Sequence, residues 1–591
     1  MNSAAPNYNG IMSTRRARIR FALPAMLLVL TVSTGQAGVQ NVPVPAIAQP
    51  LVPVTVIPGT ASFTMQVKGT GFTATSVVNW NGAPLVTTFV STDEIQATVP
   101  SRNVAVAGTA AITVVNADSP HPKVSGTVYF PINTSVSAVN FVSASYATGT
   151  NPTGIVIADV NGDGIPDLVI CNDYDNTISV LLGKEGGTFQ PQTTFPAFGF
   201  PYNIFAGDFN NDGILDLVTV DKQEAAISVF LGNGDGTFQP PKNFATTGAN
   251  PIALNIGDFN GDGNLDVVTA NSTASTLSVF LGNGDGTFQK AVNYFPGAQP
   301  NDIAVGDFNG DGIPDLAFVD NTLSAGLVGI MIGNGDGTFR PRVGYATGRG
   351  PNAIRTADLN KDGILDLITT NASGTVSVLL GNGSNGIGDG TFQTHQDMPG
   401  GSFPGYAIAT YDFNNDGNVD IIVPELNEDA LTIYLGNGDG TFQAPTTYPV
   451  LMQPDALAVA DFNNDGRLDL AVADETSNVV TIVTQLPPVV TVNPSTLAFG
   501  KVVLGETSAP QTSTVTNAGT ATVTITNIAV GGKNGSFYNQ TNTCPATLNA
   551  GQSCTITVTF APRSVGDKNG TITISDSVGT QVITLTGVGI K

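Results

Sequence analysis

Short runs of alternating apolar and polar residues recur through the middle of the chain. One unit contains an apolar run at 217–220, a variable loop, a second run at 227–231, a glycine-rich turn and a last run that ends at Phe244. Each run has the length and the two-residue period of a strand. The pattern predicts four short antiparallel strands in each unit of about 50 residues, which is the size of one propeller blade.

A nine-residue loop, Asp-x-Asn-x-Asp-Gly-x-x-Asp, joins the first two strands of each unit and occurs seven times between residues 159 and 469. Successive copies begin 49 to 54 residues apart, and this regularity indicates a repeat architecture. Oxygen-bearing side chains occupy positions 1, 3, 5 and 9, and Gly at position 6 permits a sharp turn. With the backbone carbonyl of position 7, these oxygens form the donor set that Ca2+ prefers.

Two other interpretations of this loop are less favoured. An EF-hand needs a Glu at position 12 between two helices, whereas position 12 of the first loop is Ile170 and the flanking segments are strands. A metal-free turn would bring three carboxylates together in nine residues, where they repel one another unless a cation lies between them. We therefore predict up to seven Ca2+ ions.

The predicted ligands follow the same order in all seven loops. The side-chain ligands are Asp159, Asn161, Asp163, Asp167, Asp208, Asn210, Asp212, Asp216, Asp258, Asn260, Asp262, Asp266, Asp307, Asn309, Asp311, Asp315, Asp358, Asn360, Asp362, Asp366, Asp412, Asn414, Asp416, Asp420, Asp461, Asn463, Asp465 and Asp469. The carbonyl ligands are Ile165, Ile214, Asn264, Ile313, Ile364, Asn418 and Arg467.

A second motif, Gly-Asn-Gly-Asp-Gly-Thr-Phe, joins the third and fourth strands of most units. Its Asp (Asp235 in one copy) is either a further ligand or the residue that a tight hairpin prefers, and we favour the hairpin role. The seventh unit lacks this turn and its last strand. Residues 139–146 match a last strand, so we predict that an N-terminal strand completes the C-terminal blade and leaves no open edge.

The loops and their partner turns resemble those of bacterial FG-GAP or VCBS repeat proteins, whose blades are similar to the integrin alpha-subunit propeller. The resemblance covers residues 138–486. It implies an all-β fold, a seven-bladed β-propeller with Ca2+-binding loops. Adhesion proteins, lectins and modules attached to enzymes occur in this family, so the resemblance does not select one function.

The N-terminal region contains three predicted parts. Residues 1–37 combine arginines, an apolar run and small residues before Ala37, which is typical of a secretory signal peptide, cleaved or retained as an anchor. Residues 38–52 are Pro-rich and predict a linker. Residues 53–132, with Gly69-Thr-Gly-Phe72 and Trp80-Asn-Gly82, resemble the immunoglobulin-like IPT/TIG fold.

The C-terminal residues 489–591 resemble the ASH-like immunoglobulin-like β-sandwich, through Leu497-Ala-Phe-Gly500 and the strand that follows Cys554. The two flanking sandwiches complete the predicted architecture. Cys544 and Cys554 lie ten residues apart, and we predict a disulfide between them in an oxidising compartment. Cys171 follows apolar residues and is predicted to be a buried thiol.

Charge and histidine content disfavour two classes of function, nucleic-acid binding and His-dependent catalysis. The chain has 22 Lys and Arg against 46 Asp and Glu, so we expect no nucleic-acid partner. His121 and His395 are the only histidines, which leaves no material for a zinc site or a His-based triad. We expect a protein that is not an enzyme, with a secreted polysaccharide lyase or hydrolase as the minor alternative. The apolar run near the N-terminus is shorter than the ~20 residues of a membrane span, and none is expected in the mature chain.

We therefore predict a secreted, periplasmic or cell-surface module that binds a protein ligand in adhesion, or alternatively a carbohydrate as a lectin. In a four-stranded antiparallel blade the first and third connections share one face, which here carries the metal loops and the turns. The variable loops lie on the opposite face. On that metal-distal face we expect a protein or glycan near Tyr174, Tyr202, Arg349 and Tyr406.

Overall fold

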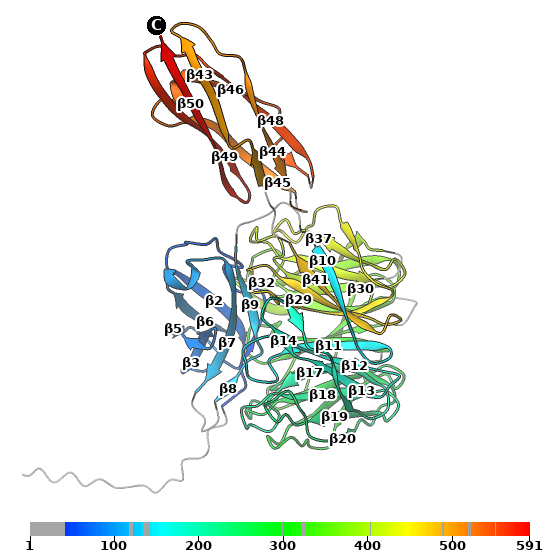
Figure 1. Ribbon diagram of the computed structural model, residues 1–591. Helices are drawn as coiled ribbons and strands as arrows, with labels where there is room; N and C mark the ends of the chain where they lie inside the picture. The colour runs from blue at the N-terminus through cyan, green and yellow to red at the C-terminus, as the bar shows by residue number, and fades with distance from the viewer. Residues whose placement is uncertain are drawn as a thin grey trace, which may run out of the picture. The chain divides into compact units, whose positions relative to one another are not determined.

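The computed structural model describes residues 42–117, 122–133, 139, 141–297, 299–321, 326–401, 404–486, 490–517, 519, 522–549 and 551–591. Within these ranges the helical segments are two short 3-10 turns, η1 (Ser101–Val104) and η2 (Gly535–Phe537), and the other regular elements are strands in small sheets (Figure 1). The predicted all-β class is confirmed. In this part of the chain no helix has the length and apolar character to span a membrane. The predicted signal peptide, residues 1–37, and His121 lie outside the described residues.

Between residues 141 and 485 the described residues form seven four-stranded antiparallel sheets, which we call repeat sheets 1 to 7. In the first six, the strands pair in chain order. Repeat sheets 1 to 3 contain β11 (Pro152–Ala158), β12 (Asp167–Asn172), β13 (Thr177–Leu181) and β16 (Thr193–Pro196); β17 (Pro201–Gly207), β18 (Asp216–Asp221), β19 (Ala226–Phe230) and β20 (Lys242–Ala245); and β21 (Pro251–Gly257), β22 (Asp266–Asn271), β23 (Thr276–Phe280) and β24 (Val292–Tyr294). Repeat sheets 4 and 5 contain β25 (Pro300–Gly306), β26 (Asp315–Asp320), β27 (Leu327–Met331) and β28 (Val343–Ala346); and β29 (Pro351–Ala357), β30 (Asp366–Asn371), β31 (Thr375–Leu379) and β34 (Gln396–Pro399). Repeat sheets 6 and 7 contain β35 (Ala409–Tyr411), β36 (Asp420–Glu425), β37 (Ala430–Tyr434) and β38 (Thr446–Pro449); and β39 (Pro454–Ala460), β40 (Asp469–Asp474), β41 (Val479–Gln485) and β10 (Phe141–Ala147). Two short hairpins, β14 (Gly183–Lys184) with β15 (Thr188–Phe189) and β32 (Gly381–Ser384) with β33 (Ile387–Phe392), lie in third connections.

Repeat sheet 7 takes its last strand from the N-terminal side of the repeats. β10 pairs antiparallel with β41 from Phe141 opposite Gln485 to Ala147 opposite Val479. Figure 1 shows the cyan β10 beside the gold β41. The predicted completion of the seventh unit by an N-terminal strand is therefore confirmed. The first strands of successive repeat sheets also contact one another, and β39 contacts β11, so the series is closed and propeller-like.

The second strand of each repeat sheet is buried at every position, whereas the sequence pattern indicated alternating strands. The reason is that neighbouring repeat sheets pack face to face and cover both sides of these strands. Between repeat sheets 2 and 3, for example, Val218 and Val229 share a cluster with Phe280 and Phe288. Phe288 meets Phe209 edge to face, with ring centroids 5.9 Å apart.

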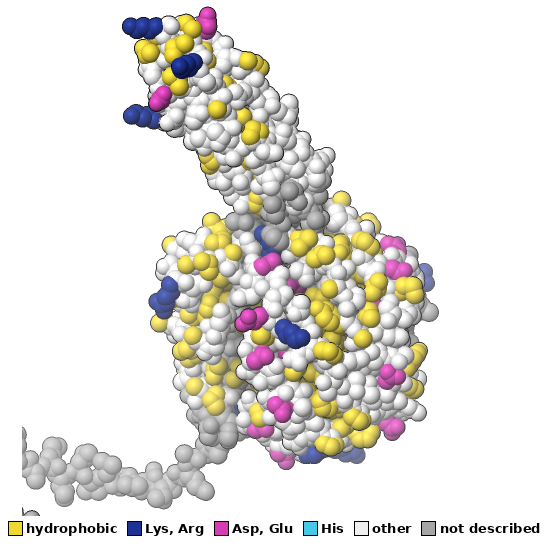
Figure 2. Space-filling view, in the orientation of Figure 1, with side chains coloured by type: hydrophobic (Ala, Val, Ile, Leu, Met, Phe, Trp, Pro, Cys, Tyr) yellow, Lys and Arg dark blue, Asp and Glu magenta, His cyan; other side chains and the backbone are white. Residues whose placement is uncertain are grey.

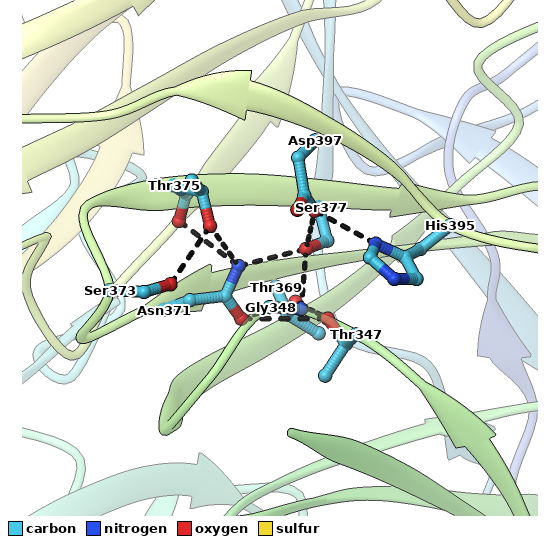
Figure 3. A network of polar contacts seen from close by, with 9 residues as sticks. All are labelled: Thr347, Gly348, Thr369, Asn371, Ser373, Thr375, Ser377, His395 and Asp397. Carbon is cyan, nitrogen blue, oxygen red and sulfur yellow. Dashed lines mark hydrogen bonds and ion pairs between the residues drawn. The ribbon is translucent and has the colours of Figure 1, made fainter. Parts of the chain in front are cut away.

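A buried polar residue ends the second strand of each repeat sheet, and Figure 3 shows the polar contacts of this residue in repeat sheet 5; the seven residues are Asn172, Asp221, Asn271, Asp320, Asn371, Glu425 and Asp474. Asn371 accepts a hydrogen bond from Thr369 Oγ1 at 3.1 Å and donates one to Ser377 Oγ at 2.8 Å. Ser377 in turn donates to Asp397 Oδ1 at 2.6 Å, and His395 Nδ1 lies 2.8 Å from the same oxygen. The carboxylate, not the imidazole, thus contacts the Ser377 hydroxyl, and this is not the order of a hydrolytic triad.

Repeat sheet 2 has Asp221 where repeat sheet 3 has Asn271, and both have equivalent Thr, Ser and Asn neighbours. Thr219 Oγ1 donates to Asp221 Oδ1 at 3.1 Å, and Ser228 Oγ is in hydrogen-bond contact with both Asp221 Oδ2 and Asn243 Oδ1. A hydroxyl carries one proton, so Ser228 can donate to only one of these two oxygens. Two arrangements satisfy both contacts: the Asn243 amide rotates and donates its Nδ2 to Ser228, or a protonated Asp221 donates to Ser228. Burial raises the pKa of Asp221 to about 7, in agreement with the second arrangement.

The described residues that precede the repeats form two sheets around one hydrophobic core. We call this part the N-terminal sandwich. Its strands are β1 (Ala46–Ile47), β2 (Phe63–Thr70), β6 (Glu94–Val99) and β5 (Val86–Phe89), and β4 (Ala83–Pro84), β3 (Ser76–Trp80), β7 (Gly108–Asn116), β8 (Lys123–Val124) and β9 (Val128–Ile132). Trp80 belongs to the core, as predicted.

The predicted linker at 38–52 needs correction for its described part. β1 pairs with β2, and Leu51 is 3% exposed within the core of the N-terminal sandwich. Apolar residues between the prolines are buried here, and an edge strand tolerates proline because its outer N–H groups need no partner strand. The sandwich therefore begins before residue 53.

The C-terminal described residues form a second sandwich with its own core. Its strands are β42 (Val490–Asn493), β44 (Gln511–Asn517), β48 (Ser553–Phe560) and β46 (Tyr538–Asn542), and β43 (Thr496–Val503), β50 (Gly579–Ile590), β49 (Gly566–Asp576), β45 (Val523–Gly531) and β47 (Thr547–Leu548). Cys544 and Cys554 form a disulfide in this sandwich. Cys171 is a buried free thiol in repeat sheet 1, and burial raises its pKa well above the ordinary value.

The Asp221→Asn variant tests the role of a protonated carboxyl in the core. The folded pKa of Asp221 lies above its unfolded value, so wild-type stability falls as pH rises from about 4 to about 7, and Asn removes this loss. We expect the stability difference between variant and wild type to grow in favour of Asn by on the order of 2 kcal/mol between about pH 5 and about pH 8. Denaturant titration at both pH values measures it, and a pH-independent difference would show that Asp221 is ionised throughout.

Candidate calcium loops and ligand face

Each predicted metal loop winds around the carboxylate at its first position. In the first loop, Asp159 Oδ1 accepts hydrogen bonds from the N–H groups of Gly162 and Asp163 at 2.8 and 3.1 Å, and Oδ2 accepts one from Gly164 at 2.8 Å. Gly164 has a φ of 81°, a left-handed conformation that explains Gly at position 6. The loop therefore turns its acidic side chains toward its own backbone.

The Asp at position 9 of the loop links the first and third connections of its repeat sheet by hydrogen bonds. Asp216 is fully buried; its Oδ2 accepts the N–H of Phe209 at 3.0 Å, and its Oδ1 accepts the N–H of Gly232, which opens the third connection, at 2.8 Å. The same pair of bonds occurs at the six other loops. Burial raises the pKa of Asp216 to about 7, and the neighbouring Asp208 and Asp212 add to the rise.

The third connection also binds the loop of the preceding repeat sheet. Gly286 donates its N–H to the carbonyl of Phe209 at 3.0 Å, and Gly337 binds Phe259 in the same way. Repeat sheet 7 has no such turn, and Gln485 replaces it: its N–H donates to Asp469 Oδ1 at 2.8 Å, and its Nε2 donates to the Phe413 carbonyl at 2.9 Å. We call this series of hydrogen bonds the loop belt. It confirms that first and third connections share one face.

The Asp of the third connection caps its own turn. Asp235 Oδ1 accepts hydrogen bonds from the backbone N–H and the hydroxyl of Thr237, at 3.0 and 2.5 Å. These hydrogen bonds lower the pKa of Asp235. The same contacts occur at Asp285, Asp336, Asp389 and Asp439. This geometry accounts for the Asp by turn formation, without a metal.

The donor chemistry of the loops fits Ca2+, because every predicted side-chain ligand is a carboxylate or amide oxygen. Asp358 Oδ1 in the fifth loop is buried without a hydrogen-bond partner, which is costly unless another group satisfies it. Among the described residues, however, no three acidic, His or Cys side chains are already arranged to hold a metal. One reason is that the Asn161 amide donates to Asp163 Oδ2 at 2.9 Å, so a bound cation would have to separate this pair.

The loop face also contacts the N-terminal sandwich. Val44 donates its N–H to Asp258 Oδ2 at 3.0 Å, and Asn133 Nδ2 donates to the Asp465 carbonyl at 3.3 Å. Lys68 Nζ donates to the Gly363 carbonyl at 2.6 Å. These contacts reach three different loops, so the chain's own sandwich occupies part of this face.

A cavity of about 1380 Å3 lies between the N-terminal sandwich and the first strands of several repeat sheets. Tyr129, Tyr411 and Gln49 line it, together with Asp159 and Asp461 of the first and seventh loops. Gln49 Nε2 donates to the Tyr411 hydroxyl at 2.9 Å. Sequence reasoning did not indicate this cavity, since its walls come from regions far apart in the chain.

Of the four residues predicted on the metal-distal face, the structure brings Tyr202 and Tyr406 together. Both are partly buried, and burial followed by the nearby Asp455 raises the pKa of both phenols. Tyr174 is 64% exposed. Arg349 is exposed in the loop that precedes repeat sheet 5. The face thus has a buried centre and exposed surroundings.

Sequence reasoning missed the charged residues beside these tyrosines. Lys222 Nζ lies 3.1 Å from the centroid of the Tyr202 ring and 3.9 Å from Asp173 Oδ2. Asp455 and Glu475 complete the group. An alignment of the repeats could have indicated these four residues, because they are charged at positions where most other repeats have uncharged residues. On the face shown in Figure 2, charged side chains are sparse, and Lys and Arg form no continuous patch.

The repeats match a known family. The model described as FG-GAP-like repeat matches residues 159–219, 208–269, 258–318, 319–369, 358–423 and 412–472, which together span more than half of the chain. The chain belongs to the FG-GAP-like repeat family. The six matches each run from one repeat to the next and together include all seven loops. Residues 487–590 match the model described as Cep192 domain 4, which confirms an ASH-like C-terminal domain.

Solved structures provide weaker comparisons for this FG-GAP-like chain. An auxiliary nutrient binding protein from Bacteroides ovatus is 12% identical over 75% of this chain and 98% of its own, with a TM-score of 0.35. A functionally unknown protein from Desulfotomaculum acetoxidans is 13% identical over 62% and 99%, with a TM-score of 0.36. The human CEP192 ASH/PapD-like domain is 19% identical over 17% and 85%, with a TM-score of 0.14. No curated protein matches the chain.

The loop belt of the FG-GAP-like repeats is tested by the Asp216→Ala variant. Alanine leaves the buried N–H groups of Phe209 and Gly232 without their acceptor. We expect a loss of stability on the order of 2 to 6 kcal/mol, with and without calcium. The matched control is Asp235→Ala in the exposed turn of the same repeat sheet, whose unfolding midpoint should stay close to wild type. Equal midpoints for the two variants in guanidinium titrations would contradict the belt.

Proposed function

We propose that this chain is an exported calcium-binding module that holds a ligand, in the first place a protein, on the face opposite its metal loops. The seven repeat sheets are the blades of a closed β-propeller, and Ca2+ ions in up to seven loops stiffen one face of it. The observation that carries the proposal is the difference between the two faces. The loop face is built from repeated elements and contacts the chain's own N-terminal sandwich, whereas the opposite face gathers non-repeated residues such as Tyr202, Tyr406 and Asp455.

Three features support this assignment. A ligand needs a surface whose chemistry is not shared by every repeat, and rigid scaffolds usually present such residues on loops. The leader-like residues 1–37 and the disulfide support an oxidising compartment outside the cytoplasm. The calcium in that compartment is compatible with weak sites, with Kd values on the order of 10⁻⁴ to 10⁻³ M.

Calcium is expected to raise the melting temperature of the protein. With about 10 mM free Ca2+ and such Kd values, each occupied loop contributes about 1.4 to 2.7 kcal/mol by binding only the folded state. Thermal unfolding in calcium, in magnesium and after EGTA treatment measures the effect. If the melting temperature is the same in calcium and in EGTA, the assignment of the loops as calcium sites is wrong.

Asp163→Asn provides the matched calcium variant. Asp163 is exposed and does not belong to the loop belt, so the substitution removes one charged ligand and leaves the frame in place. We expect one calcium fewer by isothermal titration and an unchanged melting temperature in EGTA. Asp235→Asn, which removes a charge from a turn, should keep the wild-type stoichiometry. If the turn variant binds one ion fewer, the metal lies in the third connection and the assignment to the loops is wrong.

The ligand face is tested by a fourfold alanine variant at Tyr174, Tyr202, Arg349 and Tyr406. Immobilised wild type and variant are compared for retention of envelope proteins and in glycan arrays, with Asp163→Asn as the control. We expect the fourfold variant to lose the ligand that wild type retains and to keep the calcium-dependent melt. Retention by the fourfold variant, or loss only in the loop variant, would place the ligand elsewhere.

Carbohydrate binding is the second candidate function, and the cavity beside the loops favours it. Its volume accommodates several sugar rings, and tyrosine and amide side chains such as Tyr129, Tyr411 and Gln49 suit stacking and hydroxyl recognition. Glycan binding that Tyr411→Phe weakens, while the fourfold alanine variant leaves it intact, would select this cavity over the metal-distal face.

A further inference from the structure

One ring of equivalent positions follows the second strands of the repeat sheets. In repeat sheets 1, 2, 3 and 7 these residues are Asp173, Lys222, Ser272 and Glu475, and each donates its backbone N–H to a carbonyl of the preceding connection, at 3.0 to 3.2 Å. Asn321 and Ala372 make the same bond in repeat sheets 4 and 5. The backbone geometry is therefore independent of charge. Yet charged side chains occupy repeat sheets 7, 1 and 2, which are neighbours in the closed series.

A second ring follows the proline that opens most first strands. Its members include Thr153, Ile252, Asn301 and Asn352, which are uncharged. In repeat sheet 7 the equivalent residue is Asp455, which is 4% exposed. A buried carboxylate at this position is thus not a requirement of the fold.

The two rings meet in one cluster of Asp173, Lys222, Asp455 and Glu475, which we call the rim cluster. Lys222 Nζ lies 3.9 Å from Asp173 Oδ2 and 3.1 Å from the centroid of the Tyr202 ring. Asp455 and Glu475 also interact electrostatically with Lys222, so three acidic side chains act on one ammonium group. Burial, with Glu475 as the next cause, raises the pKa of Asp455 to about 8, and burial lowers the pKa of Lys222.

Asp173 provides an independent indication of a missing partner. The residue is 7% exposed, and its Oδ1 is buried without a hydrogen-bond partner. Leaving a buried carboxylate oxygen without a donor is costly, so the rim cluster lacks a donor as well as positive charge.

We propose that the rim cluster binds the primary ammonium group of an organic cation. An ammonium group supplies three N–H donors and one positive charge, and it interacts favourably with the faces of aromatic rings such as Tyr406. The cation is either a free diamine or a lysine side chain of a protein. This inference rests on the proposed function and specifies the chemistry of its ligand face.

Isothermal titration of the full chain in calcium tests the proposal. The probes are 1,4-diaminobutane, Nα-acetyl-lysine amide and, as a neutral control, 1,4-butanediol. We expect at least one amine to bind and the diol not to bind. Binding of the diamine alone assigns a free amine as ligand, and binding of the lysine derivative assigns a side chain. Absence of binding by both amines, or equal binding of the diol, would overturn the proposal.

Variants locate the binding. Asp455→Asn and Glu475→Gln should each weaken amine binding about tenfold or more, equivalent to about 1.4 kcal/mol. The matched control is Glu224→Gln, which removes one exposed charge from the loop that also carries Lys222. If Asp455→Asn does not fold, as judged by its calcium-dependent melt, Glu475→Gln decides the outcome. Equal weakening by Glu224→Gln would show that amine binding depends only on the net charge of the protein, and this would overturn the site. The calcium melt and the fourfold alanine experiment test the proposed function separately.

Discussion

The buried carboxylate at position 9 of each loop is the interaction on which the repeat architecture depends. In repeat sheet 2, Asp216 accepts N–H groups from its own loop and from the third connection, and that connection in the next repeat binds back to the loop through Gly286. An ionisable group in the core is costly unless it is fully hydrogen-bonded. Because two backbone donors satisfy it, the Asp fixes the first and third connections against each other in repeat sheets 1 to 6. In repeat sheet 7 it binds the N–H of Gln485 instead.

This constraint makes the two faces of the repeats different in kind. The loop face repeats the same residue types seven times, and its acidic oxygens have the donor chemistry that the proposed calcium ions require. On the opposite face, the positions that follow the second strands carry only a backbone requirement, as the equivalent residues Asp173, Ser272 and Ala372 show. Its side chains are therefore free to form a site, and the rim cluster uses that freedom in three neighbouring repeats.

Much of the fold could be predicted from the sequence because it repeats. Seven copies of one loop gave the strand order, the shared face of loops and turns, and the missing strand that β10 supplies. Some features that occur once were not predicted. Gln485 alone replaces a whole turn, through its backbone N–H and its side-chain amide, and Leu51 joins a core from within a Pro-rich stretch. The rim cluster escaped prediction since Asp173 and Asp455 are far apart in sequence and meet only when the series closes.

The central claim is that the seven loops are calcium sites that stiffen one face of the repeats. Crystals grown in calcium and measured at a wavelength where calcium scatters anomalously would test it most directly. The account predicts an anomalous peak in the loops, about 2.3 to 2.6 Å from carboxylate oxygens such as those of Asp159 and Asp163. Well-ordered loops without anomalous peaks, their carboxylates bound only to backbone N–H groups, would contradict it.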